Sequence, residues 1–205
     1  MELSKLPLPE FTDALAGKTP VPGGGGASAL CASLGAALAS MVANYTVGKE
    51  KYAAVEADVS RILGEAETLR AQLLALIDAD ADAFEPLSRA YGIPKDEPGR
   101  DETLEKCLRD AAAAPMKILE LSCRCVELHK EFAEKGSSMM VSDAGTGVAF
   151  CKAALLGAAI NVKVNTKLMK DRAHAEAMNA HVDELTAKYT ALADEVFDSV
   201  YGRFN

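Results

Sequence analysis

Apolar side chains recur at intervals of three and four residues along most of the 205-residue chain, a spacing typical of amphipathic α-helices. This spacing predicts helices over residues 8–16, 51–91, 102–135 and 171–201. The longest apolar stripe consists of Tyr52, Val55, Val59, Ile62, Ala66, Leu69, Leu73, Leu76, Ala83, Phe84 and Leu87. No segment alternates in the manner of a β-strand, and no linker divides the sequence. We therefore predict one all-α domain over residues 1–205.

Two further predicted helices, residues 27–43 and 143–166, are rich in small residues, chiefly Ala, Gly and Ser. Side chains this small bury little apolar area each, so such helices need close partners on more than one side. We predict a bundle in which long amphipathic helices surround these two, and we expect the protein to form a homodimer. Residues 27–43 carry no charge, but they have few large apolar side chains, so we expect a packed helix and no membrane contact.

One carboxylate interrupts the long apolar stripe. The step of four residues after Leu76 falls on Asp80. A carboxylate in an apolar stripe is costly unless it has a partner, so two interpretations stay open. Asp80 either caps or pairs with a neighbouring helix, or it faces a functional site.

A run of four glycines, Gly23, Gly24, Gly25 and Gly26, follows Pro20-Val21-Pro22 and precedes the helix expected to begin near Ala27. The N–H groups at a helix start and the absence of β-carbons suit close approach of a ligand to the backbone. A flexible turn between helices is the alternative. A Walker loop is excluded because Ala27-Ser28-Ala29 replaces Lys-Ser/Thr, and a dinucleotide-binding loop is disfavoured because no strand precedes the glycines.

The net charge of −8 and the isoelectric point near 5.0 disfavour a nucleic-acid partner. Five cysteines without a secretory signal predict reduced thiols in a cytoplasmic protein. Cys123-x-Cys125 lacks the spacing and the second pair of a zinc site, so we expect no metal there. The three histidines, His129, His174 and His181, are expected on polar helix faces.

Five sequence motifs together resemble the formiminotetrahydrofolate cyclodeaminase and methenyltetrahydrofolate cyclohydrolase family. They are Thr19–Ala27, Thr46–Tyr52, Asp78–Phe84, Ser142–Gly145 and Gly157–Asn165, in the order in which the family carries them. The stretch from Asn165 to Arg172 is most similar to the stand-alone bacterial cyclohydrolases. One departure is Ser137 after Gly136, where many members carry Asn.

The resemblance implies an all-α homodimer that acts on a one-carbon tetrahydrofolate without a metal or other cofactor. The implied reaction is hydrolysis of 5,10-methenyltetrahydrofolate to 10-formyltetrahydrofolate. Both this reaction and cyclodeamination of 5-formiminotetrahydrofolate need a carboxylate near a cationic one-carbon centre, able to relay a proton. Two alternatives therefore remain, a cyclodeaminase that releases ammonia and a non-catalytic folate-binding protein of the same fold. A third alternative is a purely structural dimer without a ligand. It does not explain the glycine run or the position of Asp80 in the apolar stripe.

The resemblance also suggests roles for individual residues. Asp143, from the Ser142-Asp143 motif, is the first catalytic candidate, with Ser142 beside it as a substrate-binding residue. Asp80 is the second catalytic candidate, as a group that orients water or binds the pterin. Asn161 and Asn165, spaced four residues apart on one helix face, are expected to bind the amide and amino edge of the pterin. Packing between helices is the alternative for both.

The glycines Gly23, Gly24, Gly25 and Gly26 are expected to contact the substrate through their backbone. Lys49 is expected to meet a carboxylate of the glutamate tail, as are Lys167 or Arg172. A solvated cation is the alternative for each of these three.

Overall fold

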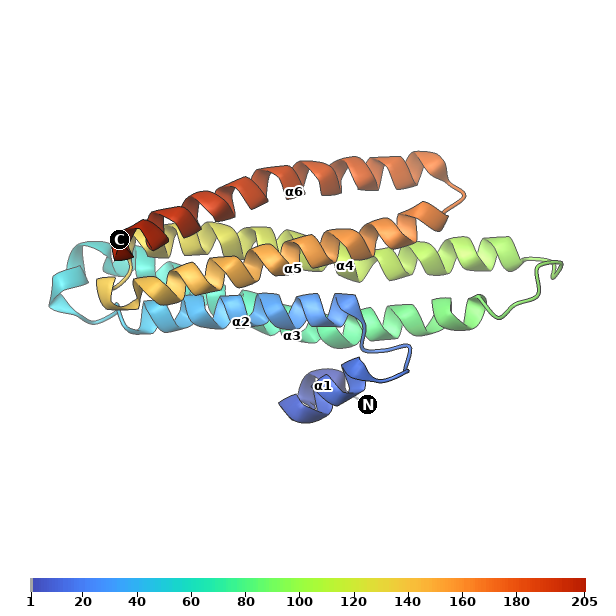
Figure 1. Ribbon diagram of the computed structural model, residues 1–205, viewed down its shortest axis with the longest axis horizontal. Helices are drawn as coiled ribbons and strands as arrows, with labels where there is room; N and C mark the ends of the chain where they lie inside the picture. The colour runs from blue at the N-terminus through green and yellow to red at the C-terminus, as the bar shows by residue number, and fades with distance from the viewer. Residues whose placement is uncertain (1) are drawn as a thin grey trace.

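The computed structural model describes residues 2–205, which form an elongated bundle of helices without a strand (Figure 1). The α-helices are α1 (Leu8–Ala16), α2 (Gly24–Asn44), α3 (Glu56–Ala90), α4 (Arg100–Lys135), α5 (Val141–Leu168) and α6 (Arg172–Tyr201). Short 3-10 helices are η1 (Leu3–Lys5), η2 (Glu50–Val55), η3 (Ser138–Met140) and η4 (Gly202–Phe204). The predicted all-α fold is confirmed, and each predicted helix is present with bounds that differ by a few residues.

Helix α5 lies between α2, α4 and α6, and α2 lies against α3 and α5 (Figure 1). Consecutive long helices run in opposite directions, and α1 lies outside the bundle below the start of α2. The side chain of Asp78 holds the N-terminal segment against α3, because it accepts hydrogen bonds from the backbone of Leu3 and from Ser4. The two small-residue helices are therefore packed side by side within the bundle, as the sequence predicted.

Small residues allow α2 and α5 to approach closely. A β-carbon on Gly35 of α2 would overlap the thiol of Cys151, and a β-carbon on Gly157 of α5 would overlap the hydroxyl of Ser28. Opposite α4, a β-carbon on Gly147 would overlap the ring of His129. Larger side chains at these positions would therefore force the helices apart.

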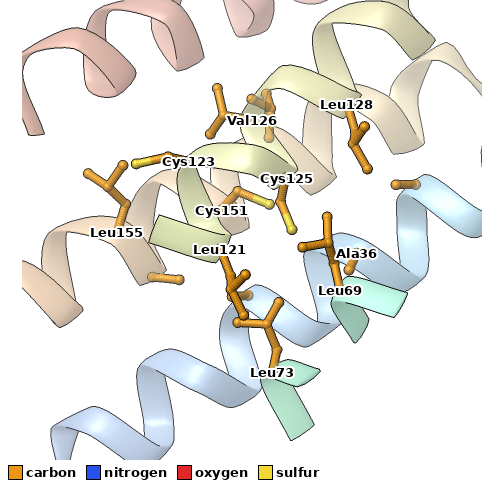
Figure 2. Packing of buried hydrophobic residues seen from close by; sticks show 14 of the residues in the cluster. Ala36, Leu69, Leu73, Leu121, Cys123, Cys125, Val126, Leu128, Cys151 and Leu155 are labelled. Atoms are coloured by element: carbon orange, nitrogen blue, oxygen red, sulfur yellow. The ribbon is translucent and has the colours of Figure 1, made fainter. Parts of the chain in front are cut away.

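The centre of the core lies where α2, α3, α4 and α5 meet (Figure 2). Leu69 of α3 lies beside Ala36 of α2, Leu73 of α3 lies beside Leu121 of α4, and the thiols of Cys125 and Cys151 meet between α4 and α5. Cys123 and Cys125 are both buried in this core, as free thiols. Within residues 2–205, no three His, Cys, Asp or Glu side chains gather closely enough to hold a metal ion.

The prediction of a surface position for His129 is wrong. Its side chain is fully buried, and Nε2 lies 3.0 Å from the carbonyl oxygen of Gly35. Burial lowers the pKa of His129 to about 4, so the ring is neutral and Nε2 donates to that carbonyl. The other ring nitrogen, Nδ1, has no hydrogen-bond partner among the described residues. Gly147 of α5 makes room for the ring.

Two helical segments, Gly24–Asn44 and Ser138–Leu168, are long and apolar enough to cross a membrane by length and composition alone. Core helices of soluble proteins meet the same criterion, and 61% of the first window and 44% of the second are buried inside this bundle. This composition is therefore weak evidence for a membrane span.

Candidate functional site

The glycine run begins helix α2 instead of forming a loop before it. Gly24, Gly25 and Gly26 are the first three residues of the helix, and the first helical hydrogen bond joins Ala27 N–H to the carbonyl of Gly23 at 3.0 Å. The sequence prediction of a helix start near Ala27 is therefore wrong by one turn. Gly23, at the N-cap position, has no side chain to cap the free N–H groups of this turn.

Asp80 of α3 supplies the missing cap. Its carboxylate lies directly over Gly25, where any β-carbon would overlap Oδ1, Oδ2 and Cγ, and it accepts a hydrogen bond from the backbone N–H of Gly26. A negative charge at this position also complements the helix dipole. The two interpretations of Asp80 are thus compatible, because a carboxylate that caps α2 also stands at the mouth of a pocket.

The apolar stripe of α3 passes beside Asp80. The buried positions here are Leu73, Ile77 and Ala81, so the expected step from Leu76 to Asp80 is out of phase by one residue. Asp80 is half-buried at the edge of the stripe. Burial raises the pKa of its carboxyl group, and the hydrogen bond from Gly26 partly offsets this rise. The pKa of Asp80 is therefore higher than that of an exposed aspartate.

Asn161 and Asn165 of α5 lie next to the start of α2. The Nδ2 of Asn161 donates to the carbonyl of Gly157 at 2.8 Å, and its amide lies against Gly24, where a β-carbon would be 3.0 Å from Nδ2. The Nδ2 of Asn165 donates to the carbonyls of Ala111 and Asn161, at 3.1 and 3.0 Å. Because these bonds use the amide donors, the amide oxygens remain as acceptors.

These groups line one pocket between α2, α3, α4 and α5. Its polar wall consists of Gly23, Gly24, Gly25, Asp80, Asn161 and Asn165, and its other wall consists of Pro20, Phe84, Ala111, Pro115 and Val164. The cavity measures about 170 Å³, which is less than the roughly 300–1,000 Å³ typical of small-molecule sites. The pocket can hold a planar ring between an apolar wall and a polar wall, and it has room for only part of a folate.

Gly26 does not line this pocket, since its α-carbon faces Pro22 and Ile77. Its contribution is the N–H that binds Asp80. The other three glycines predicted as substrate-binding residues do line the pocket, together with both predicted asparagines and one of the two predicted carboxylates.

The remaining candidates, Asp143, Ser142 and Lys49, lie at the opposite end of α2 and α5. Asp143 is half-buried in the first turn of α5. Ser142 is not the N-cap, because α5 begins at Val141 after Met140, and its hydroxyl lies 3.5 Å from the carboxylate of Asp143. Within one chain these residues do not contact the pocket.

Helix geometry gives the size of this separation. Asp143 and Asn161 are five turns apart on α5, which corresponds to about 27 Å and to the same side of the helix. Both side chains therefore point in one direction from α5, but a single one-carbon centre cannot touch both within one chain.

Lys49 and Tyr52 are two further polar residues at the end of the bundle where Asp143 lies. The ammonium of Lys49 lies 5.5 Å from the ring centre of Tyr45, and the phenol oxygen of Tyr52 accepts from Ser138 N–H at 3.1 Å. Hydrogen bonds from Ser138 and Ser137 lower the pKa of Tyr52 to about 7. Sequence reasoning missed Tyr52 as a functional candidate, although it belongs to the Thr46–Tyr52 motif.

The two other cations proposed for the glutamate tail differ in their contacts. Arg172 donates to the carbonyls of Thr166 and Met169, at 2.9 and 3.2 Å, and so satisfies the C-terminal end of α5. Lys167 is exposed on the last turn of α5, three residues beyond the pocket residue Val164. Lys167 is thus better placed than Arg172 to meet a ligand.

Larger surface grooves run elsewhere along the bundle. One, of about 560 Å³, is lined by charged residues that pair with one another, such as Arg109 with Asp171 and Lys170 with Asp101. Another, of about 580 Å³, lies between α4 and α6. Neither groove contains any of the predicted site residues, and a hollow of about 230 Å³ beside Gly48 and Glu56 contains one, Lys49. The pocket at Asp80 brings together six of them and is the better candidate site.

Comparison with known proteins gives one consistent result. Residues 7–184 match the family described as formiminotransferase-cyclodeaminase. A methenyltetrahydrofolate cyclohydrolase from Methylorubrum extorquens is 39% identical over 95% of this chain and 96% of its own. A formimidoyltransferase-cyclodeaminase from Rattus norvegicus is 32% identical over 96% of this chain, which spans 37% of the rat protein.

The fold also matches a solved structure. The crystal structure of a formiminotetrahydrofolate cyclodeaminase from Thermotoga maritima superimposes with a TM-score of 0.83, covers 97% of this chain and 96% of its own, and shares 30% identity. The sequence match over residues 7–184 and this similarity in fold agree with the resemblance drawn from the five motifs. The chain belongs to the formiminotransferase-cyclodeaminase family.

Proposed function

We propose that this protein is a methenyltetrahydrofolate cyclohydrolase, which hydrolyses 5,10-methenyltetrahydrofolate to 10-formyltetrahydrofolate. The relative of matching length with 39% identity carries that name. The observation that carries the proposal is the pocket at the start of α2, where the carboxylate of Asp80 and the amide of Asn161 converge on a backbone without β-carbons.

The pocket suits the chemistry of a pterin. The ring is planar and apolar on its faces, and Phe84, Pro115 and Val164 provide an apolar wall. Its amide and amino edge carries N–H donors, and the oxygens of Asp80, Asn161 and Asn165 are acceptors. The free N–H groups of the first turn of α2 can bind a carbonyl oxygen or a water molecule.

The reaction needs one water molecule and one proton relay. A water oxygen bonds to the carbon that bridges N5 and N10, and a carboxylate takes a proton from that water. The same carboxylic acid then donates a proton to N5 as the bond between the carbon and N5 breaks. The formyl group stays on N10, and one proton is released to solvent overall. A carboxylate beside the cationic centre also stabilises its positive charge.

Asp143 is proposed as the primary acid and base of this relay, and Asp80 as the group that orients water or holds the pterin. Asn161 and Asn165 are proposed to bind the pterin edge, with Gly23, Gly24 and Gly25 against the substrate. Lys49 or Lys167 is proposed to bind the glutamate tail. No metal and no cofactor besides the folate is required by this chemistry.

We further propose that the protein is a cytoplasmic homodimer. Large apolar side chains are exposed along one side of the adjacent helices α2 and α5, which we term the α2/α5 face. It consists of Leu34, Met41, Tyr45, Phe150, Leu156, Ile160, Val164 and Leu168. Patches of this extent on soluble proteins commonly mark an interface. A second copy is the natural occupant, because a two-fold dimer buries the same face of both subunits.

Cyclodeamination of 5-formiminotetrahydrofolate is the second candidate function. The match in fold to the Thermotoga maritima cyclodeaminase favours it, since that structure covers nearly the whole chain. In this reaction N10 attacks the formimino carbon and ammonia leaves, so the same carboxylates would serve.

The test is to follow the loss of methenyltetrahydrofolate absorbance with the purified dimer, with and without EDTA. We expect hydrolysis well above the buffer rate and no effect of EDTA. Loss of 5-formiminotetrahydrofolate with release of ammonia, and no hydrolysis of the methenyl compound, would select the second candidate. Binding of folate without turnover of either compound would indicate a carrier.

A further inference from the structure

The two helices that form the α2/α5 face pack against each other in a definite register. Gly24 of α2 lies beside Asn161 of α5, Ser28 lies beside Gly157, and Gly35 lies beside Cys151. The two helices are therefore antiparallel, and Tyr45, near the end of α2, lies level with the start of α5 at about residue 140.

Different helices supply the side chains of the two halves of the face. Its first half, near the start of α5, is formed by Tyr45, Met41 and Leu34 of α2 with Phe150 of α5, and its second half by residues 156–168 of α5. Measured along α5, the face therefore extends from about the height of residue 140 to the height of residue 168. Its middle lies near residue 154. Near the middle, the small residues Ala153 and Gly157 of α5 lie between the larger exposed side chains of Leu34 and Leu156.

A two-fold axis that passes through the middle of the face, in the interface and perpendicular to the length of the face, makes the two halves complementary. Tyr45 then meets Leu168 of the partner subunit, Met41 meets Val164 of the partner subunit, and Leu34 lies over Leu156 of the partner subunit. The first half is built on α2 and the second on α5, so the pairing leaves no part of the face uncovered. A shift of this axis along the helices would expose one end of the face in each subunit.

This axis also brings together the two polar ends of the face. Asp143 lies about eleven residues before the middle and Asn165 eleven residues after it, so this axis brings Asp143 of one chain level with the pocket end of α5 in the partner. Asp143 and Asn161 point to the same side of α5, because they are five whole turns apart. The pocket at Asp80 shares Val164 with the α2/α5 face, so this axis brings the end of the partner that carries Asp143, Lys49 and Tyr52 toward the pocket.

We infer that each active site is shared between two subunits, with Asp80, Asn161 and the glycines of α2 from one chain and Asp143 and Lys49 from the other. The inference rests on the proposed function for the identity of the substrate. It accounts for the small volume of the pocket in one chain. It also places the two predicted carboxylates near one ligand, although within a single chain Asp143 lies about 27 Å along α5 from Asn161, which lines the pocket with Asp80. Tyr52, whose pKa is lowered toward neutrality, becomes an additional group near the substrate.

Hybrid dimers test this inference. Differently tagged chains are co-expressed, and the mixed dimers are isolated by two successive affinity steps. The first hybrid pairs an Asp80→Asn chain with an Asp143→Asn chain. If sites are shared, one of its two sites has both carboxylates, so we expect about half the wild-type kcat per dimer. Each parent homodimer is expected to keep less than about one hundredth of wild-type kcat.

The second hybrid pairs a wild-type chain with a chain that carries both substitutions. Shared sites then each lack one carboxylate, so we expect this hybrid to be inactive. If each site lies within one chain, both results are reversed, with the first hybrid inactive and the second half active. That reversal, or an Asp143→Asn homodimer with wild-type kcat, would overturn the inference.

Two controls keep the test decisive. Circular dichroism verifies the fold of each variant, and Asn161→Ala replaces Asp80→Asn if loss of the α2 cap prevents folding. All dimers are also assayed with 5-formiminotetrahydrofolate. Absence of hydrolysis of the methenyl compound in the wild type rejects the proposed function alone, while the hybrids still report site sharing on the second substrate.

Discussion

The carboxylate of Asp80 occupies the space in which a β-carbon on residue 25 would lie, so Gly25 is the complement of Asp80. The contact joins α3 to the first turn of α2 and fixes the position of the carboxylate in the pocket. A glycine is needed here for close approach, since the backbone at Gly25 is helical and would accept other residues.

Gly25→Ala should therefore displace the carboxylate of Asp80. We expect kcat/KM to fall by about 10²-fold and the free energy of unfolding to fall by about 1–3 kcal/mol. The matched control is Gly64→Ala on an exposed part of α3, where an added β-carbon meets nothing within 4 Å. That variant should keep its kinetics and gain about 0.5–1 kcal/mol of stability. Equal kinetics for the two variants would show that the Gly25 contact has no part in catalysis.

Asp143→Asn should affect catalysis far more than folding. The amide keeps the size of the side chain but removes the proton acceptor, so we expect kcat to fall by 10²-fold or more. Because Asp143 is only half-buried, thermal unfolding should change little. Asp198→Asn, at an exposed position on α6, is the control that should leave both properties unchanged. A wild-type kcat with Asp143→Asn would move the primary role to Asp80.

Acid should destabilise the protein through His129. The pKa of this residue is about 4 in the folded state, against an ordinary value of 6.5, so the unfolded state binds the proton more readily. Its contribution is therefore fully present above about pH 6.5 and is lost as the pH falls toward 4. Between pH 7 and pH 5 we expect a loss of about 2 kcal/mol from this residue alone.

The measurement for His129 is urea unfolding at pH 7 and pH 5, at one protein concentration. His129→Leu should be less stable at pH 7, since the carbonyl of Gly35 loses its donor. Its stability should, however, fall less between the two pH values than that of the wild type. His181→Gln, at an exposed position, should keep the wild-type pH dependence. An identical pH dependence for His129→Leu and wild type would contradict the assigned neutral state of His129.

A cysteine near the proposed two-fold axis should cross-link the dimer. Ala153 is exposed on α5 near the middle of the α2/α5 face, so Ala153→Cys places two thiols close together across the axis. Mild oxidation with diamide should give a disulfide-linked dimer on non-reducing gels. Ala187→Cys, an exposed position on α6, is the matched control and should remain monomeric on the gel, as should the wild type. Equal cross-linking of both variants would indicate random collision instead of a defined interface.

Most of the fold was predictable from the sequence because helix periodicity and breakers are local signals. The bounds of α1 agree with the prediction, and α6 differs by one residue. The start of α2 was missed because a glycine run has low helix propensity. Asp80, more than fifty residues away in the sequence, supplies the cap that the run lacks. The surface assignment of His129 failed for a similar reason, since Gly147 on α5 makes room for its ring and the carbonyl of Gly35 on α2 accepts its hydrogen bond.

About half of the candidate site followed from the sequence as one cluster. Asp80, Asn161, Asn165 and the glycines meet in one pocket, although they come from three helices. Motif order along a chain gave no indication that Asp143 and Lys49 lie at the other end of the bundle. Their relation to the pocket depends on how two chains pair, which no local pattern in the sequence encodes.

The most direct test of the proposed function is the rate at which the purified wild-type protein hydrolyses 5,10-methenyltetrahydrofolate, measured beside Asp80→Asn and Asp143→Asn. The absorbance of the methenyl compound should decay far faster with wild type than in buffer, and the product should be 10-formyltetrahydrofolate. The two variants should show rates lower by 10²-fold or more. A folded wild-type dimer whose rate equals that of buffer would contradict the assignment as a cyclohydrolase.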